Sequence, residues 1–416
     1  MGYRNRYVED ELGSRLKRAG AVLIRGPKGC GKTETARYFA KSETVIDASP
    51  NTKNIMTLDP KLLLAGDTPH LLDEWQEQPD LWNYVRHEVD NRKLKGQFIL
   101  TGSATPNDDA KLHSGVGRFS IMQMRPMSLF ESGKSSGEVS LKAILAGEKI
   151  GSNYHEANIP HIVDNLIRGG WPGIQELDIE DARLSVLDML ELITEVDISK
   201  ISTMKRDPIK VKRLMSSIAR NISNEVKIET IAKDAGLDGS TLSYDTVRDY
   251  VDALERLMII EDLPAWNTHI RSSATLRKSR KRHFVDPSIA IAALGINGAR
   301  LQQDFEYMGY VFESLAIRDL RIYAQTMGAK LFHYRDSSGR EVDAILEMPD
   351  GSWAAFEIKL GFGAAEDGIQ SLLKFLENVD TEKVGKPKAM AVITGSGVAA
   401  THESGVQIVP LSALCA

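Results

Sequence analysis

The chain has 416 residues, 42% of them apolar and 26% charged, which is enough for several globular domains that each bury a core. A formal net charge of -5 excludes a general electrostatic attraction to nucleic acids or membranes, so any DNA contact requires a local basic patch. The two cysteines, Cys30 and Cys415, exclude a disulfide framework, and the N-terminus lacks a secretory apolar core, so we expect a cytoplasmic protein without membrane spans.

The first predicted element is a short apolar strand at residues 21–25, followed by the stretch GPKGCGKT and a helical pattern. Strand, loop and helix in this order predict a phosphate-binding loop, whereas the alternative is a glycine-rich turn without a ligand. We expect Lys32 to reach the β- and γ-phosphates of ATP and Thr33 to bind Mg²⁺. The predicted nucleotide-binding residues are Gly26, Pro27, Lys28, Gly29, Cys30, Gly31, Lys32 and Thr33.

Two further apolar runs predict the rest of an ATP-hydrolysing site. The run HLLDEW ends in Asp73 and Glu74, which we assign to Mg²⁺ binding and to activation of the attacking water, respectively. The run QFILTGSAT places Thr101 and Ser103 at the carboxyl end of a strand, where a hydroxyl can sense the γ-phosphate. The alternative is that either hydroxyl caps a helix.

A fourth run, RFSIMQM, is preceded by Gly117 and begins with Arg118. An arginine at the start of this strand lies at the opposite edge from the nucleotide of its own sheet. We therefore predict that Arg118 serves a neighbouring subunit, and that a second copy of the chain is a partner. The alternatives are a surface arginine or a salt-bridge partner.

These motifs, together with LTGSA and GRFSIMQMRPMSLFE, resemble the AAA+ ATPases, with Thr101 at the sensor-1 position. More narrowly, nearly the whole chain is similar to a prokaryotic family in which a short AAA+ domain precedes a C-terminal domain of uncharacterised function. The resemblance implies ATP and Mg²⁺ as ligands, ATP hydrolysis as the activity and, by analogy, an arginine finger at Arg118.

The middle of the chain reads as helices, broken at RGGWPG, where we expect Trp171 to fill a seam between neighbouring segments. Three further helical patterns and a strand pair containing RHFVD predict a winged helix. Its third helix exposes acidic residues, so we do not expect it to read bases. The segment 271–282 either contacts a DNA backbone or is a solvated loop. Its basic residues are Arg271, Arg277, Lys278, Arg280, Lys281 and Arg282.

The C-terminal third predicts the order helix, three strands, helix, strand. A hairpin centred on Asp350 places Asp343 opposite Glu357, with Lys359 on the same face. Neighbouring carboxylates destabilise a sheet unless a cation lies between them, and a divalent metal ion is the candidate.

This hairpin resembles the PD-(D/E)XK nuclease fold, with Asp343 as the first acid and Glu357-Ile358-Lys359 as the E-x-K element. The resemblance implies Glu313, Asp343 and Glu357 as metal ligands and Lys359 as a catalytic residue, with Gln370 as a weaker match. Val342 departs from the proline of the full signature. The alternative is a fold used only for packing or protein contact, with Asp343 and Lys359 as a salt bridge.

We therefore predict an α/β protein with a P-loop AAA+ domain (1–135), a helical lid (136–205), a winged-helix domain (206–298) and a restriction-endonuclease-like α/β domain (299–416). The predicted function is ATP hydrolysis coupled to a DNA-associated C-terminal domain that is a candidate nuclease. The alternative is an ATP-gated regulatory or protein-interaction switch with a catalytically silent C-terminal domain.

Overall fold

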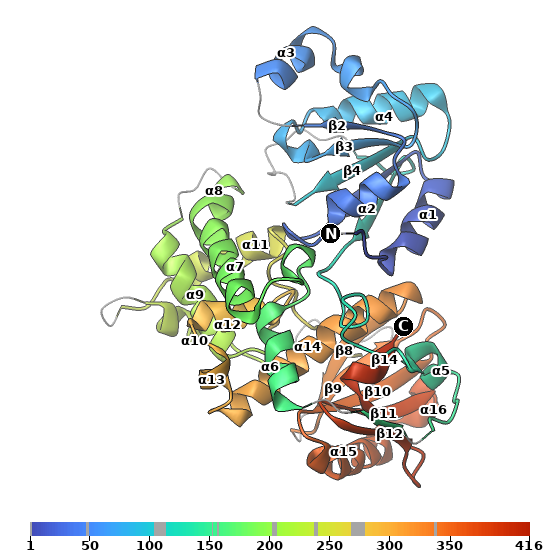
Figure 1. Ribbon diagram of the computed structural model, residues 1–416, viewed down its shortest axis with the longest axis vertical. Helices are drawn as coiled ribbons and strands as arrows, with labels where there is room; N and C mark the ends of the chain where they lie inside the picture. The colour runs from blue at the N-terminus through green and yellow to red at the C-terminus, as the bar shows by residue number, and fades with distance from the viewer. Residues whose placement is uncertain are drawn as a thin grey trace. The chain divides into compact units, whose positions relative to one another are not determined.

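The computed structural model describes residues 2–46, 50–103, 114–151, 153–155, 158–201, 206–236, 240–267, 279–336 and 339–416. The chain divides into two compact units (Figure 1). Unit 1 comprises Met1–Pro126, Val196–Lys205 and Asp252–Ile259, and unit 2 comprises Met127–Glu195, Arg206–Val251 and Ile260–Ala416.

Unit 1 is built on a parallel sheet with the strand order β2-β3-β4-β1-β5. The strands are β1 (Ala21–Arg25), β2 (Ser42–Val45), β3 (His70–Asp73), β4 (Phe98–Gly102) and β5 (Phe119–Gln123). The helices are α1 (Val8–Arg18), α2 (Lys32–Phe39), α3 (Pro50–Leu58), η1 (Pro60–Leu64), η2 (Trp75–Glu77), α4 (Leu81–Arg92) and α8 (Ile198–Lys200).

The central strands of unit 1 are apolar on both faces because helices cover both faces of the sheet. Helix α4 lies on one face, and α1 and α2 lie on the other (Figure 1). On the α4 side, Leu72, Phe98 and Leu100 join a buried cluster with Trp82 and other residues of α4. Since parallel strands end at the same edge, the segments that follow β1, β3 and β4 meet there.

The helical part of unit 2 has two groups of helices that share α12 as a packing partner. It contains α5 (Leu141–Leu145), α6 (Ile159–Arg168), η3 (Pro172–Ile174), α7 (Ile179–Leu192), α9 (Pro208–Arg220), α10 (Ile228–Ala235), α12 (Ser288–Leu294) and α13 (Gly298–Leu301). Two helices have residues in both units: the π-helix η4 (Ile193–Asp197) and the α-helix α11 (Tyr244–Arg256). Helix α12 contacts α6, α7 and α9.

Three of these helices precede a pair of antiparallel bridges. Helices α9, α10 and α11 are followed by the bridges Ile260 to Phe284 and Leu263 to Lys281. The apolar side chains Val247 and Tyr250 of α11 are buried, as their helical spacing predicts. The order of elements agrees with the sequence prediction, and the winged-helix assignment itself stays a prediction.

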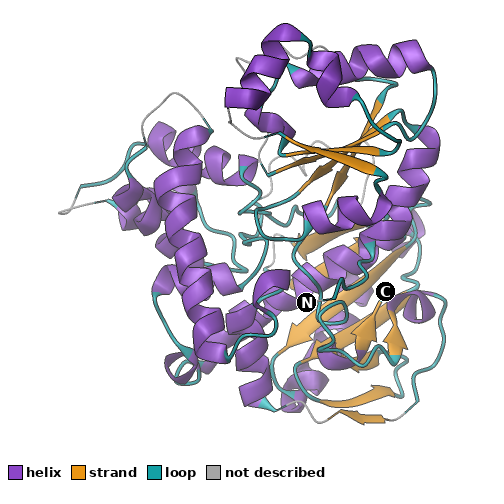
Figure 2. Cartoon of the chain, turned by 45° about the horizontal axis from the view of Figure 1, so that its top comes forward, coloured by secondary structure: helices purple, strands orange, loops and turns teal. Residues whose placement is uncertain are grey.

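The rest of unit 2 is a seven-stranded sheet with the order β7-β12-β13-β11-β10-β9-β8. Figure 2 draws the strands in orange. Its strands are β7 (Asn153–His155), β8 (Lys330–Arg335), β9 (Glu341–Glu347), β10 (Trp353–Lys359), β11 (Ala389–Thr394), β12 (Gly397–Thr401) and β13 (Gln407–Pro410). The helices are α14 (Phe305–Thr326), η6 (Phe362–Ala364), α15 (Ala365–Asn378), α16 (Thr381–Val384) and η7 (Leu411–Ala413). Strands β6 (Val139–Ser140) and β14 (Leu414–Cys415) form a separate parallel pair.

Helices α14 and α15 both pack against β9 and β10. The cluster that includes Ile345, Trp353, Ile369 and Phe375 is the buried core between α15 and the sheet. The chain therefore shows the predicted order of helix, three strands, helix and strand from α14 to β11. None of the described helices combines the length and apolarity needed to cross a bilayer.

The glycine-rich break after α6 is held by a buried carboxylate. The amide of Gly170 donates to Asp286 Oδ2 at 2.9 Å, and Arg318 Nη1 donates to the same oxygen at 2.8 Å. The indole of Trp171 is buried and donates to Ser288 Oγ at 2.9 Å. Trp171 thus fills a seam within unit 2, as the sequence predicts, and Asp286 fixes the backbone beside it.

The same arginine ties a second segment to α14. Arg318 Nη2 lies 2.7 Å from Asp319 Oδ1, and Asp319 Oδ2 accepts from the amide of Leu129 at 2.9 Å. Arg318 is 2% exposed and Asp319 is fully buried. Buried charges require partners, and this network provides an arginine to two carboxylates and backbone donors to the remaining oxygens.

Candidate functional site: a P-loop ATPase centre and a C-terminal acid cluster

The stretch from Gly26 to Thr33 follows β1 and includes the first residues of α2. Its backbone requires glycine at particular positions. Gly29 and Gly31 have φ angles of 77° and 99°, in the left-handed region that disfavours other residues. A Cβ atom on Gly26 would lie 2.2 Å from the carbonyl oxygen of Met124. These positions let backbone N–H groups converge at the start of α2, as a phosphate site requires.

Lys32 is buried in this loop. Its Nζ donates to the carbonyl oxygens of Gly26 and Pro27, both at 2.9 Å. The ammonium group therefore lies inside the loop, where it adds a positive charge to the backbone donors.

Two further residues of the loop have other partners. Lys28 is exposed, and its Nζ lies 2.5 Å from Asp197 Oδ1. Cys30 is buried with Sγ near the carbonyl oxygen of Met124, and its own carbonyl accepts from Arg6 Nη1 at 2.8 Å. Arg6 is a functional candidate that no sequence motif indicates, because it contacts the loop from 24 positions before Cys30.

The carboxylate of Asp73 joins three segments at the carboxyl edge of the sheet. Thr33 Oγ1 donates to Asp73 Oδ1 at 2.8 Å, and Thr101 Oγ1 donates to the same oxygen. Thr101 Oγ1 also accepts from the amide of Glu74 at 3.3 Å. The threonine of the loop, the end of β3 and the end of β4 are thus connected by hydrogen bonds, and their roles toward ATP and Mg²⁺ stay predictions.

Glu74 is held in an unusual backbone conformation. Its φ and ψ angles are 54° and 42°, in the left-handed region that a residue of this type adopts at a local cost. Gln76 Nε2 donates to Glu74 Oε2, and Ser103 Oγ lies 3.4 Å from that oxygen. Gln76 was missed by the sequence analysis, although it stands two residues after the acid in DEWQ.

The donor set fits a hydrated Mg²⁺ ion. A threonine hydroxyl and a carboxylate are hard oxygen ligands, and Thr33 and Asp73 already lie in contact. In this arrangement Thr33 and Asp73 would hold the ion, which would neutralise charge on the phosphates.

We expect Thr101→Val to lower kcat for ATP hydrolysis by about tenfold while leaving ATP affinity nearly unchanged, because the hydroxyl orients Asp73 and Glu74 rather than the nucleotide. Phosphate release and equilibrium nucleotide binding measure the two effects. The control Thr101→Ser keeps the hydroxyl and should retain most of the activity. An unchanged kcat in Thr101→Val would contradict this role.

Arg118 lies at the amino end of β5, far along the sheet from the phosphate loop of the same chain. The pairing of Ala21 with Phe119 places it beside the start of β1, whereas the loop follows the end of β1. Arg118 Nε lies 2.8 Å from Asp90 Oδ1, and the side chain is 41% exposed. Within the chain Arg118 is therefore a salt-bridge partner of Asp90. Its role as an arginine finger for a second copy stays a prediction.

The predicted acids of unit 2 converge near the hairpin of β9 and β10. The register pairs Phe356 with Ala344, so one step further Glu357 stands opposite Asp343. Asp343 Oδ2 accepts from the amide of Ile358 at 2.9 Å. The hairpin register predicted from the sequence is confirmed.

The predicted lysine contacts the glutamate and not the aspartate. Lys359 Nζ lies 2.8 Å from Glu357 Oε2, and Ser371 Oγ donates to Glu357 Oε1 at 3.1 Å. The alternative interpretation, a salt bridge between Asp343 and Lys359, is not what the structure shows, because Lys359 pairs with Glu357. Gln370, the weaker match to the nuclease pattern, is exposed and donates to Glu366. The residue of α15 that contacts Glu357 is its neighbour, Ser371.

A second lysine, Lys281, lies between the other two acids. Its Nζ is 2.9 Å from Glu313 Oε1 and 3.3 Å from Asp343 Oδ1. Burial by itself would lower the pKa of Lys281, but the two carboxylates hold it above its ordinary value. The ammonium group therefore stays charged.

The buried glutamates resist ionisation. Burial, and after it the charge of Asp343, raises the pKa of Glu313 from 4.5 to about 8. The same two causes raise the pKa of Glu357 to about 8. Burial therefore disfavours the charged form of both glutamates.

Two of the three acids already share a cation of the chain itself. Across the described residues, no group of three or more His, Cys, Asp or Glu side chains is placed to hold one. Glu313, Asp343 and Glu357 do lie close together, but the cation between the first two is Lys281. The ammonium of Lys281 thus lies where the sequence prediction placed a divalent ion, and metal binding by the three acids stays a prediction.

The basic segment 271–282 is only partly described. Arg271, Arg277 and Lys278 lie outside the described residues. Lys281 is buried in the acid cluster and Arg282 pairs with Asp262, so neither offers a free charge to DNA. Arg280 is exposed. The prediction of a DNA contact by the whole segment is therefore corrected for Lys281 and Arg282.

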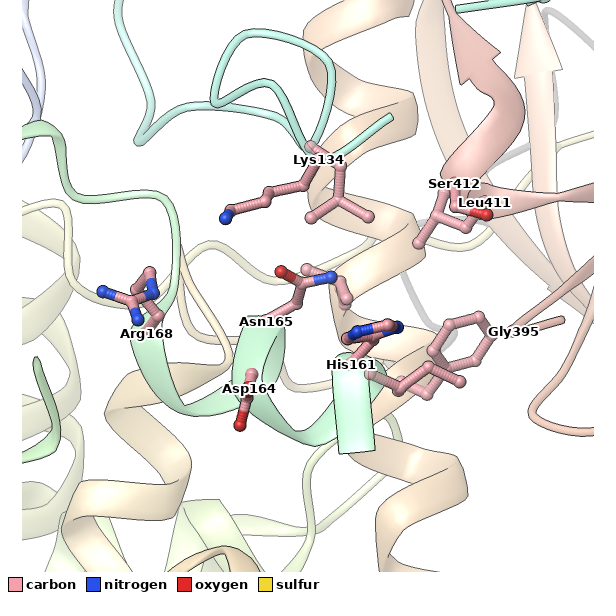
Figure 3. Close-up of a pocket in the computed structure, with 12 residues that line it drawn as sticks. Lys134, His161, Asp164, Asn165, Arg168, Gly395, Leu411 and Ser412 are labelled. Carbon is pink, nitrogen blue, oxygen red and sulfur yellow. The ribbon is translucent and has the colours of Figure 1, made fainter. Parts of the chain in front are cut away.

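A separate cavity of about 430 Å³ opens in unit 2 beside α6 (Figure 3). Lys134, His161, Asn165 and Arg168 line it together with apolar residues such as Phe312. Arg168 Nη1 donates to the carbonyl oxygens of Ile174, Gln175 and Leu177, so this arginine fixes the loop after α6. The cavity lining contains none of the predicted catalytic or metal-binding residues.

Comparisons with known proteins divide the chain into three matched regions. Residues 18–132 match the AAA domain. Residues 159–300 match a domain of unknown function (DUF8612), and residues 308–414 match a domain of unknown function (DUF4143).

Two relatives in mycobacteria cover most of the chain. The uncharacterized protein Rv2008c of Mycobacterium tuberculosis and the uncharacterized protein Mb2031c of Mycobacterium bovis are each 24% identical over 350 residues. The matched region covers 83% of this chain and 71% of each relative.

Two solved structures are similar at low TM-scores. The Walker-type ATPase PABY2304 of Pyrococcus abyssi matches with a TM-score of 0.40 and 14% identity, covering 68% of this chain and 94% of that chain. A RuvB variant from Thermotoga maritima matches with a TM-score of 0.29 and 18% identity, covering 62% and 89%. The domain match and the loop geometry together show that the chain carries an AAA-type P-loop ATPase domain.

Proposed function

We propose that the protein hydrolyses ATP with Mg²⁺ and couples this cycle to a DNA-associated C-terminal domain that is a candidate nuclease. The observation that carries the ATPase part is the hydrogen-bonded connection of Thr33, Asp73, Thr101 and Glu74 at one edge of the sheet. These are the residue types that a P-loop hydrolase needs, in contact and in the expected order.

Each residue has a distinct task in this proposal. Lys32 binds the phosphates, and Thr33 and Asp73 hold Mg²⁺, which supplies charge neutralisation when bound. Glu74 orients the attacking water and takes its proton, while Gln76 keeps the carboxylate in place. Thr101 aligns Asp73 with Glu74. Arg118 serves a second copy of the chain as an arginine finger.

The C-terminal part of the proposal rests on the convergence of Asp343, Glu357 and Lys359. An acid pair with a lysine beside it provides a base and a cationic group at one place, which hydrolysis of a phosphodiester requires. The exposed Arg280 and the basic residues before it supply the contact to a DNA backbone.

A second candidate function is an ATP-gated regulatory or protein-interaction switch with a catalytically silent C-terminal domain. The buried ion pairs of Lys281 with Glu313 and Asp343 favour it, because they neutralise the acids without a metal ion.

Nicking of supercoiled plasmid in Mg²⁺ or Mn²⁺, with and without ATP, separates the two functions. We expect Asp343→Ala and Lys359→Ala to reduce nicking by about 100-fold or more, because each removes a group at the reacting centre. Gln370→Ala on the exposed side of α15 is the matched control and should nick like the wild type. Equal nicking by wild type and both site variants would contradict a nuclease, and no nicking under any condition would favour the switch.

A further inference from the structure

We propose that Lys281 is a built-in cation that takes the place of a divalent metal ion between Glu313 and Asp343, so that the acid cluster excludes metal while Lys281 is in position. The inference rests on the proposed role of these acids and specifies its regulation. It makes Lys281 the residue that decides whether the cluster binds metal.

The contacts of the ammonium group are those of a shared counter-ion. Nζ lies 2.9 Å from one oxygen of Glu313 and 3.3 Å from one oxygen of Asp343. The lysine side chain is 5% exposed, and the carboxylates are 11% and 13% exposed. A divalent ion would need these same oxygens, so lysine and metal compete for one place.

Lys281 is held by its backbone as well as by its charge. Its amide donates to the carbonyl oxygen of Leu263 at 3.0 Å, and the amide of Leu263 donates back at 2.9 Å. The neighbouring Arg282 pairs with Asp262. Two residues along, His283 is fully buried with Nδ1 3.1 Å from Ser314 Oγ, next to Glu313 on α14. Backbone hydrogen bonds therefore hold Lys281 in place, and withdrawing its ammonium would require several of these bonds to break.

In this proposal the charge of Lys281 determines whether a divalent ion binds at the acid cluster. Lys281 supplies the positive charge that both Glu313 and Asp343 contact, whereas Lys359 contacts Glu357. A divalent ion added beside Lys281 would meet a positive charge at close range in a buried site, which is unfavourable. Removing Lys281 leaves a deep carboxylate pair without a cation, and such a pair attracts metal.

The test compares Mn²⁺ binding in nucleotide-free wild type and Lys281→Met, a neutral side chain of similar length. We expect Lys281→Met to bind one additional Mn²⁺, about tenfold or more tighter than any Mn²⁺ at this cluster in the wild type. Electron paramagnetic resonance of free Mn²⁺ measures the binding. Mn²⁺ should also raise the melting temperature of Lys281→Met and not that of the wild type, since a ligand stabilises the state it binds.

Two further variants test whether the additional Mn²⁺ binds at the acid cluster. Lys281→Arg keeps the charge and should not gain Mn²⁺, and the double variant Lys281→Met with Asp343→Asn should lose the gain. A folded Lys281→Met without extra Mn²⁺ would overturn the proposal.

A measurement without any change at Lys281 covers the case of misfolding. In the presence of Lys281, Asp343→Asn should leave Mn²⁺ binding unchanged, and a loss of binding in this variant would overturn the proposal. Metal binding is read out separately from plasmid nicking, so an absence of nicking would end the nuclease proposal and leave this one standing.

Discussion

Glu74→Gln is expected to reduce kcat for ATP hydrolysis by about 10² to 10⁴-fold while ATP still binds, because the amide cannot take a proton from water. The geometry supports a positioned base: Glu74 has a fixed left-handed backbone and a side chain held by Gln76. Phosphate release gives kcat, and equilibrium binding of a fluorescent nucleotide gives the affinity. Both should be measured in the full chain.

Lys32→Ala should act earlier in the cycle than Glu74→Gln. Loss of a charged hydrogen bond of about 1.5–3 kcal/mol weakens ATP binding by about 10- to 100-fold. The matched control for Glu74→Gln is Glu77→Gln, the same change at an exposed glutamate three residues later. This control should leave kcat and ATP affinity near the wild-type values. Unchanged turnover in both Lys32→Ala and Glu74→Gln would end the ATPase assignment.

Arg318→Met is expected to destabilise unit 2 by about 3–5 kcal/mol, because it leaves the buried carboxylates of Asp286 and Asp319 without a counter-ion. The loss should appear as an earlier unfolding transition in urea. Hydrogen exchange should also accelerate at the amides of Gly170 and Leu129, which donate to these two carboxylates.

The control for this prediction is Arg335→Met. Arg335 makes a surface pair with Glu341 and is 46% exposed, so the same substitution should change stability by less than about 0.5 kcal/mol. Equal losses in Arg318→Met and Arg335→Met would show that the buried network contributes no more than a surface pair.

Local chemistry explains which parts of the ATPase centre could be predicted. The phosphate loop is a continuous segment whose glycines and lysine act through their own backbone, so its residues are readable in order. Asp73 is the last residue of β3 and Thr101 the last but one of β4, and parallel strands bring their carboxyl ends together. Gln76 and Arg6 could not be predicted because their roles depend on where side chains reach after folding.

The C-terminal cluster shows the same division between local and long-range information. The opposition of Asp343 and Glu357 follows from the length of a hairpin turn, which the sequence alone determines. The cation between Glu313 and Asp343 is Lys281, which precedes Glu313 by 32 residues. The basic composition around Lys281 indicated a solvated or DNA-binding loop.

The sequence by itself determined the phosphate-binding loop, the acidic pair Asp73 and Glu74 after an apolar strand, and the register of the C-terminal hairpin. Each of these features depends on neighbours along the chain. Only the tertiary structure decided which charges meet: Arg318 with Asp286, and Lys281 with the acids of α14 and β9. The physical reason is that a buried charge takes its partner from whichever segment packs beside it, and packing is not a local property of the sequence.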